Sequence, residues 1–311
     1  MPENLDLSIV IPVYNEADNL EHLYQRLSKL AELQSLKSEF IFVDDGSSDS
    51  SFKTIERLAA IDPRVKGLSF SRNFGHMFAL TAGLDASRGR AVITLDADLQ
   101  HPPEVIPVLL QKWKHGAEIV NTLRIDSAGT AFFKRVTAGT FYRLMQRIAR
   151  INLPQNAADF RLLDRKVVET LKTVRERGRF LRGLISWVGY KQEFVEYKAE
   201  KRLAGQTKYS LGKMIAFALD GITSFSAVPL RFATYLGLLT ALISFLYMIY
   251  ALYQHFFTSH TLEGWTSVMV TVLFIGGIQL IFLGVIGEYL SRVYEETKQR
   301  PLYIISRKVG L

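Results

Sequence analysis

Apolar runs of strand length alternate with amphipathic stretches along the first 125 residues of the chain. The β-branched runs LSIVIPV (7–13) and FIFVD (40–44) are typical of strands in a parallel sheet that is covered on both faces. The first run is followed by NEADNLEHLYQRLSKLAEL, which has apolar residues at helical spacing. Further strands are expected in VKGLSF, AVITLDADLQ and AEIVNTLR. This alternation predicts an α/β domain with a mostly parallel sheet.

Polar residues stand where the predicted strands end. In open α/β sheets, ligands bind beyond the carboxyl ends of the strands, so we expect these residues to gather at one edge. They are Tyr14, Asn15, Glu16, Asp44, Asp45, Arg72, Asn73, Asp96, Asp98 and Arg124. No G-x-G-x-x-G follows the first strand and no Walker-type motif is present, which argues against a dinucleotide-dependent oxidoreductase.

The stretch ITLDADLQHPPE (93–104) ends an apolar run in alternating polar residues. In an extended chain, Asp96, Asp98 and Gln100 would point to one side. Their oxygens are suitable ligands for Mg²⁺ or Mn²⁺ gripping the phosphates of a substrate. The alternative is a strand that leaves the sheet into a polar turn, with two prolines ending the pairing. This stretch alone leaves both interpretations open.

Two long stretches near the C-terminus lack acidic and basic residues. They run from Arg231 to Glu263 and from Glu263 to Glu288. Each contains an apolar run of about 20 residues, enough to span a bilayer as a helix. We therefore predict transmembrane helices at about 232–256 and 266–287, within a membrane segment 232–290. Buried core helices are the alternative, but the length and the lack of charge favour the membrane.

The distribution of basic residues predicts the orientation. The loop QHFFTSHTLEGW has no Lys or Arg, whereas the flanking segments carry eight, namely Lys208, Lys213, Arg231, Arg292, Lys298, Arg300, Arg307 and Lys308. The positive-inside rule then places both termini in the cytoplasm. The polar start MPENLD does not read as a signal peptide. We expect a cytoplasmic catalytic domain at 1–205 and a cytoplasmic tail at 291–311.

A net charge of +8 suggests an anionic partner or surface. We expect no nucleic acid, because no recognised binding motif is present. Residues 131–150 mix aromatic and aliphatic residues with five basic ones, as in a basic amphipathic helix on anionic headgroups. An ordinary surface helix with a solvated basic face is the alternative. Residues 206–231 are a second interfacial candidate. The absence of cysteine excludes disulfides, thiolate metal sites and a cysteine nucleophile.

The motifs SIVIPVYNE, FVDDGSSD and LDADLQ, followed by two closing spans, resemble the family 2 glycosyltransferases of the GT-A fold. The resemblance is closest to the polyprenyl-phosphate glycosyltransferases, which include dolichol-phosphate mannose synthases and bactoprenol glucosyltransferases. It covers nearly the whole chain. It implies a Rossmann-like GT-A domain, interfacial helices and two transmembrane helices in an integral protein of the bacterial inner membrane. It also implies inverting, metal-dependent transfer of a sugar from a nucleotide-sugar donor to a polyprenyl phosphate.

The resemblance also assigns candidate site residues. The base and ribose of the donor would be held by Pro12, Tyr14, Glu16 and Asp44, with Asp45 beside them. Asp96 and Asp98 match the D-x-D motif of the family, in which Asp98 and Gln100 would bind the divalent ion, Mg²⁺ or Mn²⁺. Basic positions associated with the phosphates of donor and acceptor match Arg124, Lys134 or Arg135, and Arg202.

Asp159 and Arg161 form a further candidate pair in the motif Asp-Phe-Arg, where some relatives have Gly in place of the Asp. Asp159 is a candidate for orienting Arg161 or the acceptor, and the alternative is a helix cap before RLLDRKVVETL. His76 in SRNFGH is a candidate either for a phosphate contact or for a hydrogen bond that stabilises its loop.

The expected chemistry needs no strong general base, because a phosphate monoester has a second pKa of about 6 and is mostly dianionic at neutral pH. The protein must instead bring two anionic groups together. A divalent ion on the leaving diphosphate and Arg or Lys on the incoming phosphate would do so. In-line attack opposite the leaving group would invert the anomeric configuration.

The pattern of SRNFGH, DADLQ and DFR favours UDP-glucose as donor, and GDP-mannose is the alternative. A processive polysaccharide synthase is not expected, because two spans leave little room for a pore and no Q-x-x-R-W motif is present. From a different class, a membrane-anchored nucleotide-sugar sensor without turnover stays open. Aromatic-rich spans and the basic tail suggest a homo-oligomer.

Overall fold

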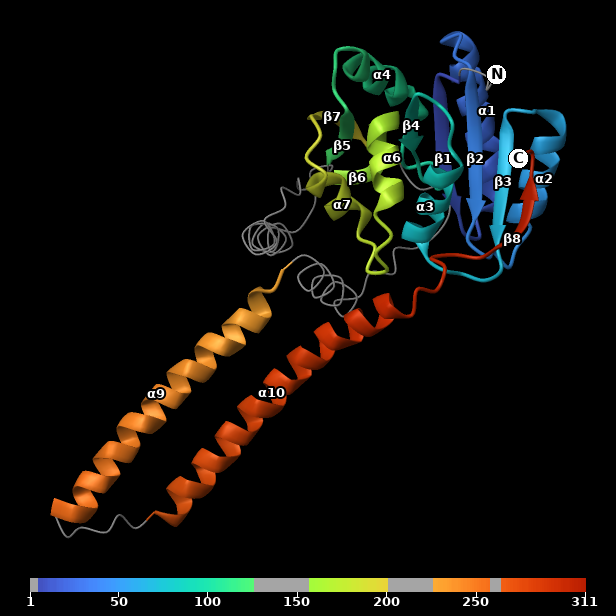
Figure 1. Ribbon diagram of the computed structural model, residues 1–311. Helices are drawn as coiled ribbons and strands as arrows, with labels where there is room; N and C mark the ends of the chain where they lie inside the picture. Colours follow the sequence, from blue (N-terminus) through green and yellow to red (C-terminus); the bar gives the residue numbers. More distant parts are fainter. Residues whose placement is uncertain (1–4, 126–156, 201–225, 258–263) are drawn as a thin grey trace. The chain divides into compact units, whose positions relative to one another are not determined.

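The computed structural model describes residues 5–125, 157–200, 226–257 and 264–311. Two compact units are present (Figure 1). The first is formed by Met1–Ala216 together with Arg300–Leu311, and the second by Phe217–Gln299. The C-terminal residues therefore return to the first unit after the chain has passed through the second.

The first unit is built on a mixed sheet with the strand order β7-β5-β6-β4-β1-β2-β3-β8 among the described residues. Parallel pairing joins β1 to β2 and β4, β2 to β3, and β5 to β7, whereas β6 and β8 run antiparallel to their neighbours. The predicted mostly parallel α/β sheet is confirmed. The strands are β1 Leu7–Val13, β2 Ser38–Asp44, β3 Val65–Phe70, β4 Ala91–Thr94, β5 Ile119–Ile125, β6 Ala157–Asp164, β7 Gln192–Lys198 and β8 Ile305–Val309.

Helices cover both faces of the sheet, which explains why every position of β1 and β2 is buried. Leu20, Leu23 and Leu27 of α1 share a core with Ile9 and alternate residues of β1. On the other face, α3 approaches so closely that a Cβ atom at Gly83 would lie 2.1 Å from Val10 Cγ1. The helices of this unit are α1 Ala17–Leu33, α2 Ser51–Ile61, α3 His76–Ala86, α4 Ile106–Lys114 after the turn η1 Pro103–Val105, α6 Arg165–Thr173 and α7 Leu181–Trp187.

At two places the structure decides between alternatives that the sequence left open. Strand β4 ends at Thr94, and the chain then turns, with Leu99 at a φ of 59° and the Asp98 carboxylate accepting a hydrogen bond from Gln100 N at 3.1 Å. The extended alternation expected through Gln100 is therefore absent, and the polar turn is present. Asp159 lies inside β6 and not before a helix; Asp164 caps α6 by accepting a hydrogen bond from Lys166 N.

The second unit contains the long helices α9 (Val228–Phe257) and α10 (Trp265–Thr297). Segments of both, Val228–Tyr253 and Val270–Thr297, are long and apolar enough to cross a membrane. The two predicted apolar helices are present and run beyond their predicted limits, so that 228–231 belongs to α9. Residues 131–150 and 206–225, predicted as interfacial, lie outside the described residues.

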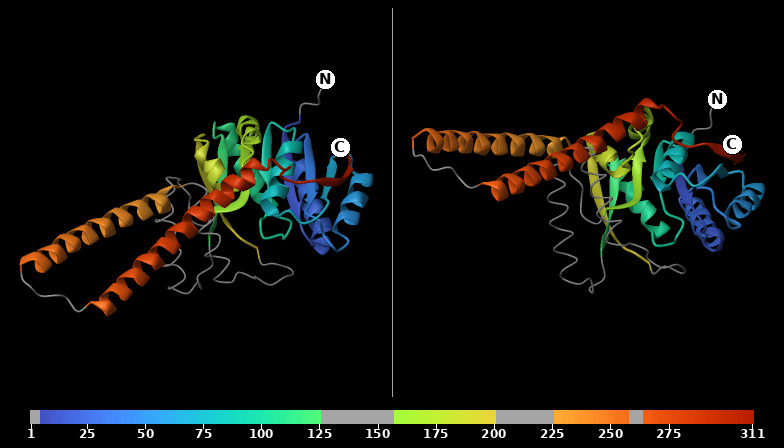
Figure 2. Two further views of the ribbon diagram at one scale, coloured as in Figure 1. Left: turned by 60° about the horizontal axis from the view of Figure 1, so that its bottom comes forward. Right: turned by 90° about the horizontal axis from the view of Figure 1, so that it is seen from below.

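The C-terminal tail is part of the catalytic sheet. After α10, residues of β8 pair antiparallel with β3, with Gly67 opposite Val309 and Ser69 opposite Arg307. In Figures 1 and 2 this red strand lies beside β3. The tail predicted at 291–311 thus consists of the last turns of α10 and an edge strand.

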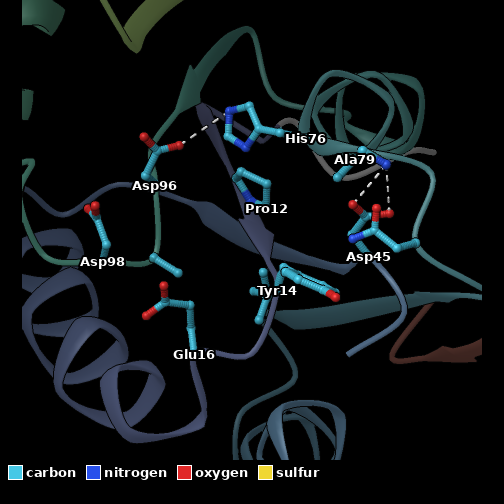
Figure 3. A pocket seen from close by; sticks show the side chains of 12 residues that line it. Pro12, Tyr14, Glu16, Asp45, His76, Ala79, Asp96 and Asp98 are labelled. Atoms are coloured by element: carbon cyan, nitrogen blue, oxygen red, sulfur yellow. Dashed lines mark hydrogen bonds and ion pairs between the residues drawn. The ribbon is translucent and has the colours of Figure 1, made fainter. Parts of the chain in front are cut away.

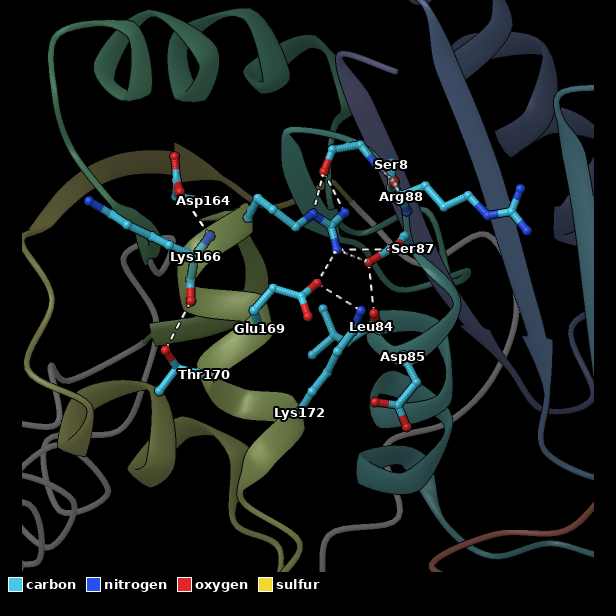
Figure 4. Close-up of polar contacts among 12 residues, drawn as sticks. Ser8, Leu84, Asp85, Ser87, Arg88, Asp164, Lys166, Glu169, Thr170 and Lys172 are labelled. Carbon is cyan, nitrogen blue, oxygen red and sulfur yellow. Dashed lines mark hydrogen bonds and ion pairs between the residues drawn. The ribbon is translucent and has the colours of Figure 1, made fainter. Parts of the chain in front are cut away.

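A buried ion pair fixes the amino ends of the strands. Glu39 of β2 accepts hydrogen bonds from Ser8 Oγ at 2.6 Å and from Arg88 N at 2.7 Å, and its other oxygen lies 2.5 Å from Lys66 Nζ. Arg165 of α6 donates hydrogen bonds to the carbonyl oxygens of Ser87 and Gly89, the two neighbours of Arg88 in the segment between α3 and β4. Figure 4 shows this region, where α6 meets the end of α3. The sheet and α6 therefore hold the segment between α3 and β4 from two sides.

We expect Glu39→Gln to destabilise the protein by about 3 kcal/mol, since it leaves the Lys66 ammonium buried without a counter-charge. This corresponds to a fall of roughly 6 to 12 °C in the unfolding midpoint of the purified protein in detergent. Glu21→Gln is the matched control, because Glu21 pairs with Arg57 at the exposed surface. That change should cost less than about 1 kcal/mol. Equal shifts for the two variants would contradict the assignment.

Candidate active site

A pocket of about 310 Å³ opens at the carboxyl ends of β1, β2 and β4. Six of the predicted site residues line it, namely Pro12, Tyr14, Glu16, Asp45, Asp96 and Asp98. Figure 3 shows their side chains around the pocket, with His76 on the far side from Glu16. Parallel pairing aligns Val13 with Asp44 and Val10 with Thr94, which is why motifs far apart in the sequence meet here.

The loops after β1 and β2 hold each other by hydrogen bonds. Asn15 adopts a φ of 56°, donates from its backbone N to Ser47 Oγ at 2.9 Å and accepts from Ser48 N at 2.9 Å. Glu16 N donates to Ser51 Oγ at 3.0 Å. These contacts keep the Tyr14 ring, which is 51% exposed, and the Glu16 carboxylate at the pocket wall.

The two adjacent aspartates of the second motif have different surroundings. Asp44 is 1% exposed, does not line the pocket, and accepts hydrogen bonds from Ser69 Oγ at 2.8 Å and Ser47 N at 3.1 Å. Asp45 faces the pocket and accepts from Phe74 N at 2.7 Å and Gly75 N at 2.9 Å. Burial raises the pKa of Asp45, and these two N–H groups oppose that rise. Of the pair, Asp45 is therefore the one presented to a ligand.

Glycine is required between these loops. Gly46 has a φ of 68°, and a Cβ atom there would lie 2.4 Å from the backbone carbon of Arg72. Only a residue without a side chain lets the loop after β2 pass this close to the loop after β3.

The turn after β4 presents two carboxylates suited to a divalent cation. Asp96 Oδ1 is buried and accepts no hydrogen bond from the described residues, although His76 Nε2 lies 3.5 Å away. Gln100 Oε1 accepts a hydrogen bond from Arg124 at 3.1 Å. Within the described part of the chain, no group of three His, Asp or Glu residues is close enough to hold a metal alone. One or two carboxylates suffice, however, where water and substrate phosphates complete the shell. The residues present therefore fit Mg²⁺ or Mn²⁺.

A charged cluster adjoins the pocket through His76. The Asp159 carboxylate accepts a hydrogen bond from Arg161 at 2.9 Å. It accepts two more from Arg182, whose Nε and one terminal nitrogen each lie 2.9 Å from a carboxylate oxygen. His76 Nε2 lies 3.7 Å from Asp159 and bridges it to Asp96. The interpretation of His76 as a residue that stabilises its loop is too narrow, because its ring lies between Asp159 of β6 and Asp96 of the turn after β4.

The charges in this cluster determine its protonation. Burial alone would raise the pKa of Asp159, but the Arg182 charge, hydrogen bonds from His76 and Arg182, and the Arg161 charge hold that pKa well below its usual range. Burial lowers the pKa of Arg161 to about 10, with Asp159 opposing the fall. Burial would lower the pKa of His76, but the carboxylates of Asp159 and Asp96 raise it overall. Near neutral pH the cluster contains an ionised Asp159 between two cationic guanidinium groups.

Arg182 is the cluster member that sequence reasoning missed. It lies in RFLRGLISW on α7, where nothing in the local pattern distinguishes it from an ordinary helix arginine. Only the packing of α7 brings it to β6. Three predicted basic residues, Lys134, Arg135 and Arg202, lie outside the described residues.

Comparison with known proteins places this site in a family context. The family described as "Glycosyl transferase family 2" matches residues 8–172, and the one described as "GtrB C-terminal hairpin" matches residues 228–293. The chain is 48% identical over 311 residues to an uncharacterized glycosyltransferase of Bacillus subtilis, covering 100% of this chain and 96% of the relative. It is 45% identical over 305 residues to the bactoprenol glucosyl transferase of Shigella phage SfX, covering 98% and 100%.

A solved structure also resembles the chain. It is glucosyl-3-phosphoglycerate synthase from Mycobacterium tuberculosis in complex with Mn²⁺, UDP and phosphoglyceric acid. The two chains are 20% identical with a TM-score of 0.48, and the match covers 70% of this chain and 76% of that one.

Removing the charge of Asp159 should destabilise the protein at neutral pH. Asp159→Asn leaves Arg161 buried without its carboxylate, at a cost of about 3 kcal/mol. Asp159 has a lowered pKa, so its contribution is present above the unfolded-state value of about 3.9 and is lost as the pH falls through the folded-state value. The difference in unfolding midpoint between wild type and Asp159→Asn should grow as the pH falls from 8 to 5, because Asp159 also raises the pKa of His76, and it should shrink below about pH 4.

Asp18→Asn is the control, since Asp18 is exposed in the first turn of α1 and the cost of the change should stay below about 1 kcal/mol. A difference between wild type and Asp159→Asn that does not shrink below about pH 4 would contradict the proposed charge state.

Proposed function

The chain belongs to glycosyl transferase family 2, and we propose that it transfers glucose from UDP-glucose to a polyprenyl phosphate with inversion of the anomeric centre. The resemblance and the enzyme class predicted from the sequence are confirmed. The observation that carries the proposal is a single pocket in which Tyr14, Glu16 and Asp45 face Asp96 and Asp98. Full-length relatives named bactoprenol glucosyl transferase support the acceptor class and the sugar.

The donor would lie across this pocket. The exposed Tyr14 ring offers a flat apolar surface for the base, and the carboxylates of Glu16 and Asp45 can accept hydrogen bonds from ribose hydroxyls. We assign Asp44 an indirect role, because its carboxylate is used by Ser69 and Ser47 inside the protein. A volume of about 310 Å³ is at the lower end of the usual range for small-molecule sites.

The diphosphate would lie beside the turn after β4. Asp98 and Gln100, with Asp96 nearby, would hold the divalent ion, and the ion would neutralise charge on the leaving diphosphate. Arg124 contacts the Gln100 side chain, which fixes the amide oxygen at this place. The family resemblance adds Lys134 or Arg135 and Arg202 as further phosphate contacts.

The acceptor phosphate would bind near the charged cluster. It needs cationic groups and not a strong base, since it is mostly dianionic at neutral pH. Asp159 holds Arg161 and Arg182 in place, and the partly exposed Arg182 adds positive charge beside the bound phosphate. His76, beside Asp96, stands between this cluster and the donor pocket. Its raised pKa favours the cationic form next to two anionic substrates.

The helix pair α9 and α10 suits a lipid acceptor, because burial of a polyprenyl tail is favourable by about 0.8 kcal/mol per CH₂. Residues before α9 and after α10 both contribute to the catalytic unit. A pair that crosses twice therefore leaves that unit on one side of the membrane, which we assign to the cytoplasm from the basic flanks. A homo-oligomer stays a prediction, and the tail that suggested it supplies a strand to its own sheet.

The reaction can be tested with purified protein in lipid nanodiscs containing undecaprenyl phosphate. We expect a hexosyl lipid from UDP-glucose that forms with Mg²⁺ or Mn²⁺ and disappears with chelator, followed by mass spectrometry. Asp98→Ala should lower the rate about a hundredfold or more. Asp6→Ala is the control, because Asp6 precedes β1 at the opposite end of the sheet.

Product from GDP-mannose alone would contradict the donor assignment. Nucleotide binding without product from any donor would favour the sensor interpretation.

Reversing two basic charges should weaken binding of the lipid acceptor and leave binding of the donor nucleotide unchanged. We expect Lys134→Glu with Arg135→Glu to raise the KM for polyprenyl phosphate at least about tenfold, because each basic residue near anionic headgroups contributes about 1 kcal/mol. The affinity for UDP, measured by calorimetry, should stay within about twofold of wild type. Equal losses for both substrates would contradict the assignment of these residues to the lipid side.

A further inference from the structure

We propose that the C-terminal strand β8, together with Tyr303 before it, positions the loop that holds Asp45 and thereby sets the affinity for the nucleotide of the donor. The inference rests on the proposed function of the pocket as a donor site. Its elements are Tyr303, β8 and the loop 71–75 that follows β3. None of these tail residues lines the pocket, so the effect is one of positioning.

Strand β8 is closely fitted to β3. A Cβ atom at Gly67 would lie 2.7 Å from Val309 Cγ1, so only glycine allows the approach. Ser306 Oγ donates to the carbonyl oxygen of Ser69 at 3.0 Å, and the Arg307 guanidinium lies 4.2 Å from the centre of the Phe52 ring. These contacts make β8 an integral strand of the sheet and not a loosely attached tail.

Tyr303 anchors the chain just before the strand. Its ring stacks on Phe70 with centroids 5.1 Å apart and an interplanar angle of 15°. Its hydroxyl donates to Asp85 at 2.7 Å, and Arg175 binds both oxygens of the same carboxylate at 2.7 and 3.1 Å. Arg177 also donates to the carbonyl oxygen of Arg300. Tyr303 thus joins the end of β3 to the end of α3.

Two routes lead from the tail to the pocket, and the first passes through the loop 71–75. The Phe70 ring meets Phe74 edge-on at 5.6 Å, and Phe74 N is one of the two backbone donors to Asp45. At the start of the same loop, Ser71 N donates to the carbonyl oxygen of Ile304 at 3.0 Å. The loop that holds the Asp45 carboxylate is therefore bound to the tail directly through the Ser71 backbone, and indirectly through the Phe74 ring, which packs on Phe70.

The second route passes through the strand itself. Ser69 lies opposite Arg307 in the ladder, and its hydroxyl donates to Asp44 at 2.8 Å. Without β8, β3 would become an edge strand with unpaired backbone groups, and the Phe70 ring would lose its stacking partner. The hydrogen-bond donors to Asp44 and Asp45 would then be held less firmly in place. A site that must be ordered at the moment of binding has lower affinity.

The test measures UDP binding by calorimetry and steady-state kinetics on full-length protein in nanodiscs. Tyr303→Ala should raise the Kd for UDP and the KM for UDP-glucose about tenfold, because an aromatic pair and a hydrogen bond to a carboxylate are lost. The kcat at saturating donor and the KM for polyprenyl phosphate should be unchanged. Tyr303→Phe keeps the ring and should raise the Kd about threefold or less. Lys308→Ala, an exposed position of the same strand, should match wild type.

Tyr303→Leu provides a second variant that keeps apolar bulk in case Tyr303→Ala does not fold. A wild-type Kd for UDP in the folded variant would overturn the inference. A lower kcat with unchanged donor KM would also overturn it. Wild-type protein that binds no UDP would contradict the proposed function itself, whereas UDP binding that does not respond to Tyr303 would contradict only the role of the tail.

Discussion

Parallel pairing of β1 with both β2 and β4 is the constraint on which the site depends. Because the three strands run in one direction and in fixed register, the loops that follow them emerge at the same edge. Each loop is short and carries carboxylates, so acidic groups from residues 16, 45, 96 and 98 surround one pocket. The amino ends are fastened separately by Glu39 and Lys66, which leaves the carboxyl ends available for a ligand.

Concentrating acidic groups at one edge requires compensating charge from elsewhere in the fold. The antiparallel strand β6 supplies Arg161, which is 4% exposed and would be costly to bury alone. Asp159 pairs with it and with Arg182, and His76 connects this group to Asp96. The result is an alternation of negative and positive groups beside the pocket. Such an arrangement suits two anionic substrates that must approach each other.

The two long apolar helices and the catalytic sheet belong to separate compact units, yet the chain joins them twice. It enters the helix pair after the catalytic domain and returns from α10 directly into β8. Since β8 contacts β3 beside the loop that holds Asp45, the chain returns to the first unit next to a loop of the pocket.

The sequence by itself determined the α/β class, the family and the two apolar helices. These follow from period-two and period-3.6 patterns, from uncharged length, and from contiguous motifs, all of which are local. It also indicated most of the pocket residues, because strand ends are visible in the pattern. The tertiary structure decided the rest. Local pattern left open whether an extended run continues through Gln100 or ends in a polar turn, and the chain turns after Thr94.

Asp159 shows the same limit, since its position before an amphipathic stretch resembled a cap until pairing with β4 and β5 placed it within a strand. Arg182 joins the cluster through packing of α7, and β8 joins the sheet across more than two hundred residues of sequence. Such contacts depend on which surfaces meet after folding. No local pattern of apolar and polar residues encodes that choice, because it is made by the packing free energy of the whole domain.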